Sequence, residues 1–207
     1  MTQTAWPNRI GQSVATEVRR HRQSQGMSAQ QLADRCAALG FPIGRSVLAN
    51  FESGRRPALS VPELLVLAKA LGVPPGALLF PVGRVDQVEP LPDRTAAPWD
   101  ALQWFTGEQP LDRSADYEEW REDRAGLDTY RWHARYLDEW HADQDAAARA
   151  NTEHARAALL RQAAGRETPL WDARRRLRGL GLKLPELPAE LRHIDDTDYR
   201  PDWGNLR

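Results

Sequence analysis

Between residues 10 and 82, the chain is a series of short stretches with helical periodicity that glycine or proline repeatedly interrupts. Gly26, Gly40 and Gly72 follow three of these stretches, at positions where helices commonly end. Pro42 disfavours helical geometry at the residue before it. A segment divided in this way is restricted to short helices, so we predict five of them, packed together as one domain.

Two of the predicted helices begin with a capping box, in which a serine and the residue three positions later satisfy free backbone N–H groups. Ser28 and Gln31 have this spacing, and so do Ser60 and Glu63. Apolar residues then recur three and four residues apart, which gives each helix one apolar face. These residues are Leu32, Ala33, Cys36 and Leu39 in the second helix and Leu64, Leu67, Ala68 and Leu71 in the fourth.

The third predicted helix, residues 44–53, has a polar side and an apolar side. In "IGRSVLANFESGRRP", the residues Val47, Leu48 and Phe51 face the core when the chain turns by about 100° per residue. The opposite side carries a guanidinium, a hydroxyl, a methyl and an amide, from Arg45, Ser46, Ala49 and Asn50. Arginine and asparagine can each make paired hydrogen bonds to a base edge in the major groove, and a methyl can contact thymine. We therefore predict that these four residues contact DNA bases.

Basic residues lie next to this helix and in the first part of the chain generally. Arg55 and Arg56 directly follow the helix, and we predict that they bind phosphates, which positions a domain without selecting sequence. Residues 1–83 contain nine Arg and Lys and four Asp and Glu, whereas residues 84–207 contain 19 and 25. The net charge of −1 thus divides into +5 and −6, so only the first part is expected to meet a polyanion.

Three motifs make residues 10–82 resemble the lambda-repressor/Cro-like helix-turn-helix family, also called the Xre family. In chain order they are "GMSAQQLADRC", "SVLANFESGRRP" and "SVPELLVLAKALGVPPGALL". In that family the second and third helices form the helix-turn-helix, and the third enters the major groove. The resemblance therefore implies a sequence-specific transcription regulator that binds double-stranded DNA.

The resemblance also implies roles for residues outside the third helix's polar side. Ser28 and Gln30 match positions near a phosphate, and Arg22 and Glu52 match an ion pair between the first helix and the recognition helix. Two features depart from the family pattern. The turn at residues 37–44 is several residues longer than usual, and an often polar position is Ala29.

The remaining chain is also predicted to be helical, which gives an all-α protein. Seven of the eight tryptophans follow residue 98, and no proline interrupts residues 117–164, where we expect one long helix or two stacked ones. The stretch after residue 82 is rich in proline and lacks periodicity, as linkers often do. The predicted divisions are an N-terminal arm at 1–9, the DNA-binding domain at 10–82, a linker at 83–97, a helical domain at 98–183 and an extended acidic tail at 184–207.

One face of the long helical segment carries Trp132, Tyr136 and Trp140, each four residues from the next. The segment is apolar on two sides and has to bury both. We predict that this face binds a second copy of the chain, since twofold DNA sites require a dimer. Three alternatives stay open: a compact bundle without a partner, a pocket for a small effector, and an antitoxin-like or antirepressor-like module that binds another protein.

Several classes of protein do not fit the sequence. No apolar run approaches the roughly 20 residues that span a bilayer. The N-terminus lacks a secretory leader, and the single Cys36 excludes an intrachain disulfide, so we expect a soluble protein of the bacterial cytoplasm without a membrane partner. His133, His141 and His154 lack the spacing of paired zinc ligands on a helix, and no catalytic motif is present. We therefore expect no metal, no cofactor and no enzymatic activity.

Overall fold

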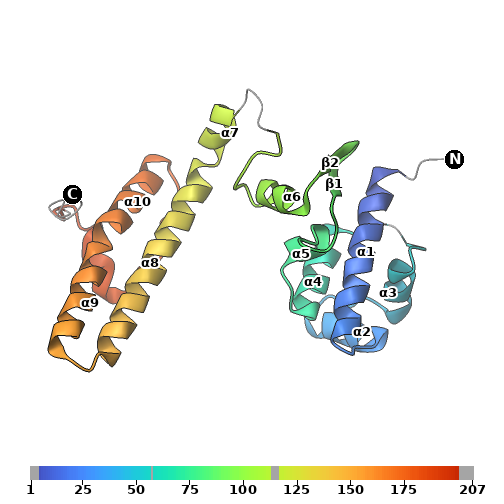
Figure 1. The fold of residues 1–207 in the computed structure, drawn as a ribbon, viewed down its shortest axis with the longest axis horizontal. Coiled ribbons are helices and arrows are strands. Elements are labelled where there is room, and N and C mark those ends of the chain that lie inside the picture. The colour runs from blue at the N-terminus through green and yellow to red at the C-terminus, as the bar shows by residue number, and fades with distance from the viewer. Residues whose placement is uncertain (1–4, 57, 113–116, 201–207) are drawn as a thin grey trace. The chain divides into compact units, whose positions relative to one another are not determined.

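The structure, a computed structural model, describes residues 5–56, 58–112 and 117–200 (Figure 1). The chain divides into two compact units, Met1–Arg113 and Ser114–Arg207. Each unit has a hydrophobic core of its own. Helices dominate both units, so the predicted all-α class is confirmed.

Five helices form the centre of the N-terminal unit, as the glycine and capping patterns predict. They are α1 (Trp6–Ser24), α2 (Ala29–Ala38), α3 (Arg45–Glu52), α4 (Val61–Leu71) and α5 (Pro75–Leu79). The structure differs from the prediction at the start, where residues 6–9 are helical and do not form an arm. Pro7 lies in the first turn of α1, where a missing N–H costs nothing and a fixed φ favours the helix. The rest of the predicted arm, residues 1–4, lies outside the described residues.

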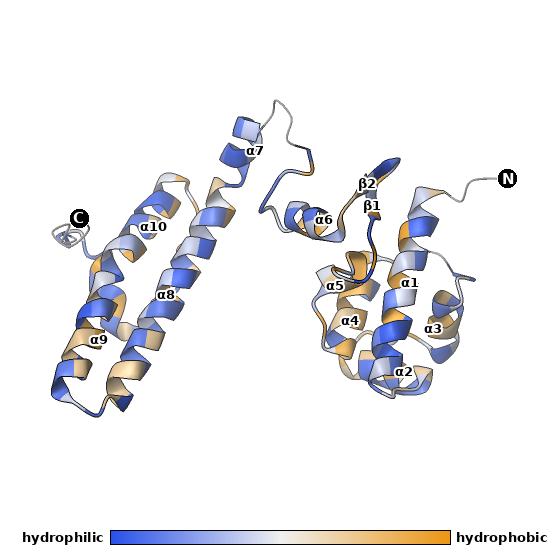
Figure 2. Cartoon of the chain, viewed as in Figure 1, coloured by the Kyte–Doolittle hydropathy of each residue, from blue (hydrophilic) through white to orange (hydrophobic). Residues whose placement is uncertain are grey.

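Local sequence signals account for how these helices begin and pack. Ser28 Oγ accepts a hydrogen bond from the Gln31 N–H at 3.2 Å, and Gln31 Oε1 accepts one from the Ser28 N–H at 2.7 Å. The capping box between Ser60 and Glu63 is formed in the same way. Figure 2 shows apolar residues gathered on α4 and α5, which pack against α1 and α2. The most deeply buried side chains include Val18, Leu32, Cys36, Leu48, Phe51, Leu67 and Leu78.

The predicted linker is an antiparallel hairpin that belongs to the N-terminal unit. Its strands are β1 (Val88–Leu91) and β2 (Arg94–Ala96), with Asp93 in the left-handed region at the turn, φ 57°. The start of α1 holds the hairpin in place. Trp6 Nε1 donates to the Glu89 carbonyl at 3.0 Å, and the Arg9 guanidinium binds the Glu89 carboxylate, with Nε 2.7 Å from Oε2. The prediction that residues 83–97 form a linker is therefore wrong for β1 and β2, which pack on the N-terminal unit.

Helix α6 (Pro98–Phe105) also belongs to the N-terminal unit, so the predicted boundary of the second domain at residue 98 is wrong. Its residues pack on α5 and on Phe80, which follows α5. The Phe105 and Phe80 rings lie 5.6 Å apart, and a Cβ added at Gly76 would come within 2.8 Å of Leu102 Cδ1. Helix α6 therefore packs closely on α5, and a larger residue at position 76 would require the Leu102 side chain to move.

The C-terminal unit is built around a helical hairpin. Its elements are α7 (Tyr117–Asp123), α8 (Ala125–Arg149), α9 (Glu153–Gly165), α10 (Glu167–Gly179) and the 3₁₀ helix η1 (Ala189–Asp195). The segment predicted as one long helix or two is interrupted at Arg124 and again at residues 150–152. Thr152 caps α9, and its Oγ1 accepts from the Ala155 N–H at 3.2 Å. The core contains Trp140, Ala163, Leu170, Leu191 and Ile194.

The predicted extended tail contains part of this core. Within residues 184–200, Leu191 and Ile194 of η1 are each 1% exposed. Pro188 precedes η1, and the short 3₁₀ helix turns both apolar side chains toward α8 and α10. The prediction of an extended tail is therefore wrong for η1, because burial of two apolar residues fixes the segment. The last seven residues lie outside the described part of the chain.

A buried polar network connects α8, α10 and η1. Arg174 is 3% exposed, and its guanidinium binds both carboxylate oxygens of Asp195, at 2.7 and 2.6 Å. Its Nη1 donates to the Pro185 carbonyl at 2.8 Å and lies 3.0 Å from His133 Nε2. Since arginine can only donate, His133 Nε2 is the acceptor and the imidazole is neutral. Asp195 itself is 32% exposed, and its carboxylate connects η1 to the buried guanidinium of α10.

This network predicts that the C-terminal unit loses stability in mild acid. Burial first, and then the charge of Arg174, lowers the pKa of His133 from 6.5 to about 4, while Asp195 opposes the shift. The unfolded chain binds a proton at this histidine more readily, so stability is full above pH 6.5 and falls as the pH drops toward 4. The shift corresponds to a loss of up to about 3 kcal/mol. Hydrogen exchange of α8 and α10 peptides across this pH range measures it, and His133→Gln should remove the dependence.

Candidate nucleic-acid interface

Helix α3 has the two sides that the sequence predicts. Leu48 and Phe51 are each 1% exposed and lie in the core against α1 and α2. The four residues of the opposite side, Arg45, Ser46, Ala49 and Asn50, are all exposed. In the described part of the chain, the side chains of Arg45 and Asn50 form no hydrogen bond or ion pair. The buried side of α3 is thus packed in the core, and its exposed side presents the guanidinium of Arg45 and the amide of Asn50 to solvent.

A bidentate ion pair fixes the C-terminal end of α3. Arg22 Nε and Nη2 bind the two carboxylate oxygens of Glu52 at 2.7 and 2.5 Å. The remaining Nη1 donates to the Met27 carbonyl at 2.6 Å. The hydrogen bond to Glu52 raises the pKa of Arg22 further above its usual value. The ion pair that the resemblance implies is thus present, and it ties α3 to α1 and to the α1–α2 turn.

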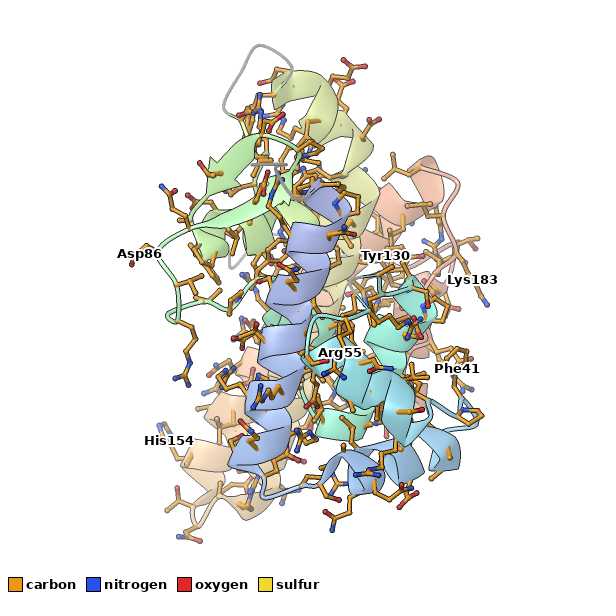
Figure 3. All side chains as sticks on the ribbon, turned by 90° about the vertical axis from the view of Figure 1, so that its right-hand side faces the viewer. Phe41, Arg55, Asp86, Tyr130, His154 and Lys183 are labelled. Atoms are coloured by element: carbon orange, nitrogen blue, oxygen red, sulfur yellow. The ribbon has the colours of Figure 1, made fainter. Side chains whose placement is uncertain are left out.

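The four predicted phosphate contacts differ in how free their side chains are. Ser28 is engaged in its capping box, Gln30 Nε2 donates to Asp34 Oδ1 at 2.8 Å, and Arg56 pairs with Glu63 at 2.7 Å. Arg55 is exposed, and among the described residues it has no side-chain partner (Figure 3). Arg55 is therefore the strongest candidate of the four for a phosphate contact.

The long turn before α3 is anchored at one point. Ile43 is 5% exposed and lies in the core, whereas Leu39 and Phe41 are 44% and 40% exposed. Gly40 occupies the left-handed region with φ 82°, which lets the chain reverse after α2. Figure 3 labels Phe41 on this turn. The extra residues thus form an exposed loop beside α3, and the buried Ile43 holds the loop's second half.

The predicted dimer face in the C-terminal unit is not a continuous exposed surface. Trp140 is 6% exposed and belongs to the core with Leu170 and Leu191. Tyr136 is half-buried against that core, and Trp132 is 42% exposed. Each step of four residues rotates the side chain by about 40°, so the three positions turn progressively from solvent to the core. The prediction that Trp140 faces a partner is therefore wrong, because its side chain lies in the core, whereas Trp132 remains exposed.

Within the described residues, no group of three or more His, Cys, Asp and Glu side chains is arranged to hold a metal ion. No helix there has both the length and the apolar content required to cross a membrane. Burial raises the pKa of the Cys36 thiol, which favours its unreactive, protonated form.

Comparison with known proteins supports the N-terminal assignment. Residues 13–79, about a third of the chain, match the family model of a helix-turn-helix domain. No curated protein and no solved structure matches the chain. The matched segment extends from α1 to the last residue of α5, so it contains α2, α3 and the ion pair between Arg22 and Glu52. The N-terminal unit therefore contains a helix-turn-helix domain, a type of domain that binds DNA.

Proposed function

We propose that this protein is a sequence-specific transcription regulator of the Xre, or lambda-repressor/Cro-like, type, and that α3 enters the major groove of double-stranded DNA. The observation that carries the proposal is the exposed pair of Arg45 and Asn50 on a helix whose other side is buried. Leu48 and Phe51 fix the position of that helix, and Glu52 fixes its end. A helix fixed in this way can present these groups to base edges without any rearrangement of its backbone.

Each residue of the α3 surface has a distinct proposed role. Arg45 pairs with a guanine and Asn50 with an adenine, each through two hydrogen bonds. Ser46 adds a hydroxyl contact, and Ala49 contacts a thymine methyl or lets the backbone approach the bases. Arg55 binds a phosphate beside the groove, with weaker contributions from Ser28, Gln30 and Arg56, whose side chains already have partners within the protein.

The proposal includes a homodimer in the bacterial cytoplasm. A twofold operator presents two equivalent half-sites about one helical turn apart, and a dimer places one α3 in each. The same geometry serves repression, because an occupied promoter excludes polymerase, and it also serves activation. The net charge of +5 in residues 1–83 is consistent with an N-terminal unit that approaches a polyanion.

Selection of bound fragments from a random-sequence DNA pool tests this function directly. The full-length protein at near-physiological salt should enrich a motif with two symmetric halves. The spacing of the halves then reports the distance between the two α3 helices. Enrichment of a single half-site would support DNA recognition and argue against the homodimer. Failure of the folded protein to enrich any sequence would contradict the proposal.

Arg55→Ala should weaken binding to the selected site and to random DNA by the same factor. A phosphate contact carries no sequence information, so the slope of log affinity against log salt should flatten by about one unit. Arg56→Ala is the matched comparison, because Arg56 is already paired with Glu63 and should change the slope less. Fluorescence anisotropy titrations at several salt concentrations measure both. A salt slope that stays at its wild-type value in Arg55→Ala would show that this arginine does not contact phosphate.

A further inference from the structure

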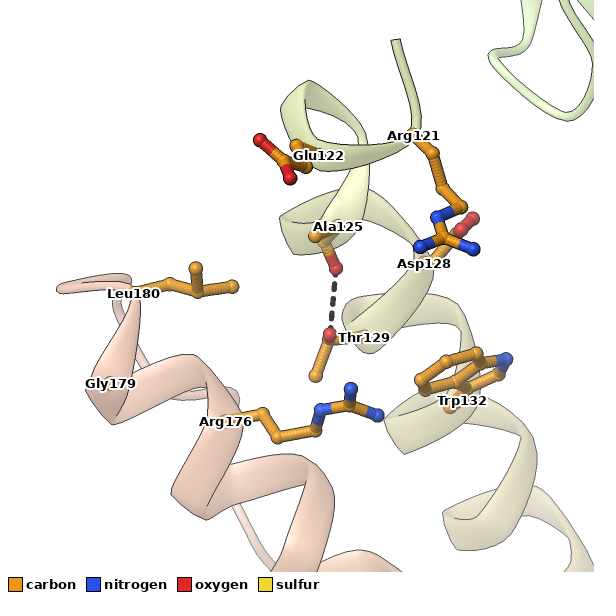
Figure 4. A pocket seen from close by; sticks show the side chains of 9 residues that line it. All are labelled: Arg121, Glu122, Ala125, Asp128, Thr129, Trp132, Arg176, Gly179 and Leu180. Carbon is orange, nitrogen blue, oxygen red and sulfur yellow. Dashed lines mark hydrogen bonds between the residues drawn. The ribbon is translucent and has the colours of Figure 1, made fainter. Parts of the chain in front are cut away.

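A cavity of about 620 Å³ lies within the C-terminal unit, between α8 and the end of α10 (Figure 4). The indole of Trp132, on α8, lines one side of it, and Leu180, the residue that follows α10, lines another. Ala125 and Thr129 line the side between them. The volume is in the range of small-molecule sites, and the walls combine an aromatic face with aliphatic groups.

The polar group that reaches into this cavity is Arg176. Its neighbours on α10 are occupied: Arg174 and Arg178 bind Asp195, and Arg175 pairs with Asp172. Within the described residues, the Arg176 side chain forms no hydrogen bond or ion pair and has only a cation–π contact with Trp132. Figure 4 shows its side chain extending from α10 toward α8, where the guanidinium carbon lies 5.3 Å from the centre of the Trp132 ring. The guanidinium thus makes a cation–π contact with the indole, a contact that leaves its N–H donors available to an acceptor.

The other charged groups of the cavity are balanced within the protein. Asp128 binds Arg124 at 2.5 Å and lies 3.5 Å from Arg131, so its charge is compensated. Arg121 pairs with Glu118 at 2.8 Å, and the Thr129 hydroxyl donates to the Ala125 carbonyl. The remaining carboxylate, Glu122, is exposed on α7, where water and salt screen it. Arg176 is thus the group best placed to select the charge of a ligand.

We propose that this cavity binds a small planar aromatic carboxylate. The ligand's ring packs on the Trp132 indole, and its carboxylate accepts two parallel hydrogen bonds from the Arg176 guanidinium. This pairing matches the fork geometry of arginine and favours an anion over a neutral isostere. The flat indole favours an aromatic ring over a puckered aliphatic one. The site lies wholly in the C-terminal unit, so it does not depend on the proposed DNA binding.

Isothermal titration calorimetry of the full-length protein with naphthoate tests the proposal. Naphthoate should bind saturably at one site per chain. Naphthamide, which has the same shape without the charge, should bind at least about tenfold more weakly, and so should cyclohexanecarboxylate. Absence of saturable naphthoate binding would overturn the proposal, and equal affinity for the amide would overturn the role of Arg176.

Two variants and two matched controls locate the site. Arg176→Gln should weaken naphthoate binding by about tenfold or more and remove the preference over naphthamide. Trp132→Leu should weaken both aromatic ligands. The controls are Arg175→Gln and Trp171→Leu, because the Arg175 guanidinium lies 5.2 Å from the Trp171 ring, a similar pair in which neither residue lines this cavity. If Arg176→Gln binds no differently from Arg175→Gln, naphthoate binds elsewhere and the proposed site is wrong.

Discussion

The double variant Arg45→Ala/Asn50→Ala should lose its preference for the selected DNA site while it keeps most of its affinity for random DNA. Each residue is expected to make a bidentate base contact that contributes about 1–3 kcal/mol of discrimination, so the pair contributes about 2–6 kcal/mol. Neither side chain has a partner in the described part of the protein, so their removal leaves no group unsatisfied in the fold. The loss should therefore appear in recognition and not in stability.

The measurement is a pair of binding titrations, one with the selected site and one with a scrambled duplex of equal length. Arg19→Ala is the charge-matched control, since Arg19 is exposed on α1 and not on α3. It should lower both affinities slightly and leave their ratio unchanged. If the double variant reduces both affinities in proportion, α3 contacts the backbone and not the bases, and the proposed reading surface is wrong.

The N-terminal helices were predictable because their signals are local. A capping box lies within four residues, as at Ser28 and Gln31, and an apolar face repeats every turn. The same argument holds for the two sides of α3, since eight residues of one helix decide which side chains face the core. The ion pair between Arg22 and Glu52 joins residues 30 apart, and only the family resemblance indicated it.

The hairpin was missed, and α6 was assigned to the wrong unit, because residues distant in sequence hold both on the N-terminal unit. Prolines and the lack of periodicity in residues 83–97 are typical of a linker, and the strands are only three and four residues long. What keeps them on the unit is the contact of Glu89 with Trp6 and Arg9, more than 75 residues away in sequence. A pattern within the segment cannot reveal such a partner.

In the C-terminal unit, too, residues distant in sequence decide which side chains of a candidate site are exposed. The spacing of Trp132 and Trp140 indicates a shared face, but the burial of Trp140 depends on η1, which supplies Leu191 and Ile194 from beyond α10. Likewise, three of four similar arginines on α10 find an aspartate, and the sequence does not show that Arg176 is the exception. Pairing across the fold decides which of these residues remain available to a ligand.

Arg174→Ala should destabilise the C-terminal unit by about 3–5 kcal/mol, the usual effect of breaking a buried ion pair. The substitution leaves the Pro185 carbonyl and His133 Nε2 without their donor and removes both bonds to Asp195. Asp195 is itself 32% exposed and keeps Arg178 as a partner, so the loss should lie near the lower end of that range. Hydrogen exchange of peptides from α8, α10 and η1 measures the effect in this unit separately from the N-terminal one.

Comparison with Arg175→Ala separates the effect of losing a buried ion pair from the effect of losing one positive charge. Arg175 is the next residue on α10 and also pairs with an aspartate, but its side chain is 65% exposed and the contact is 3.4 Å. An exposed pair of this kind is expected to contribute less than about 1 kcal/mol. If the two variants exchange at the same rate, the network around Arg174 does not hold η1 against α8 and α10. A large difference would show that the segment predicted as a tail is stabilised by one buried guanidinium.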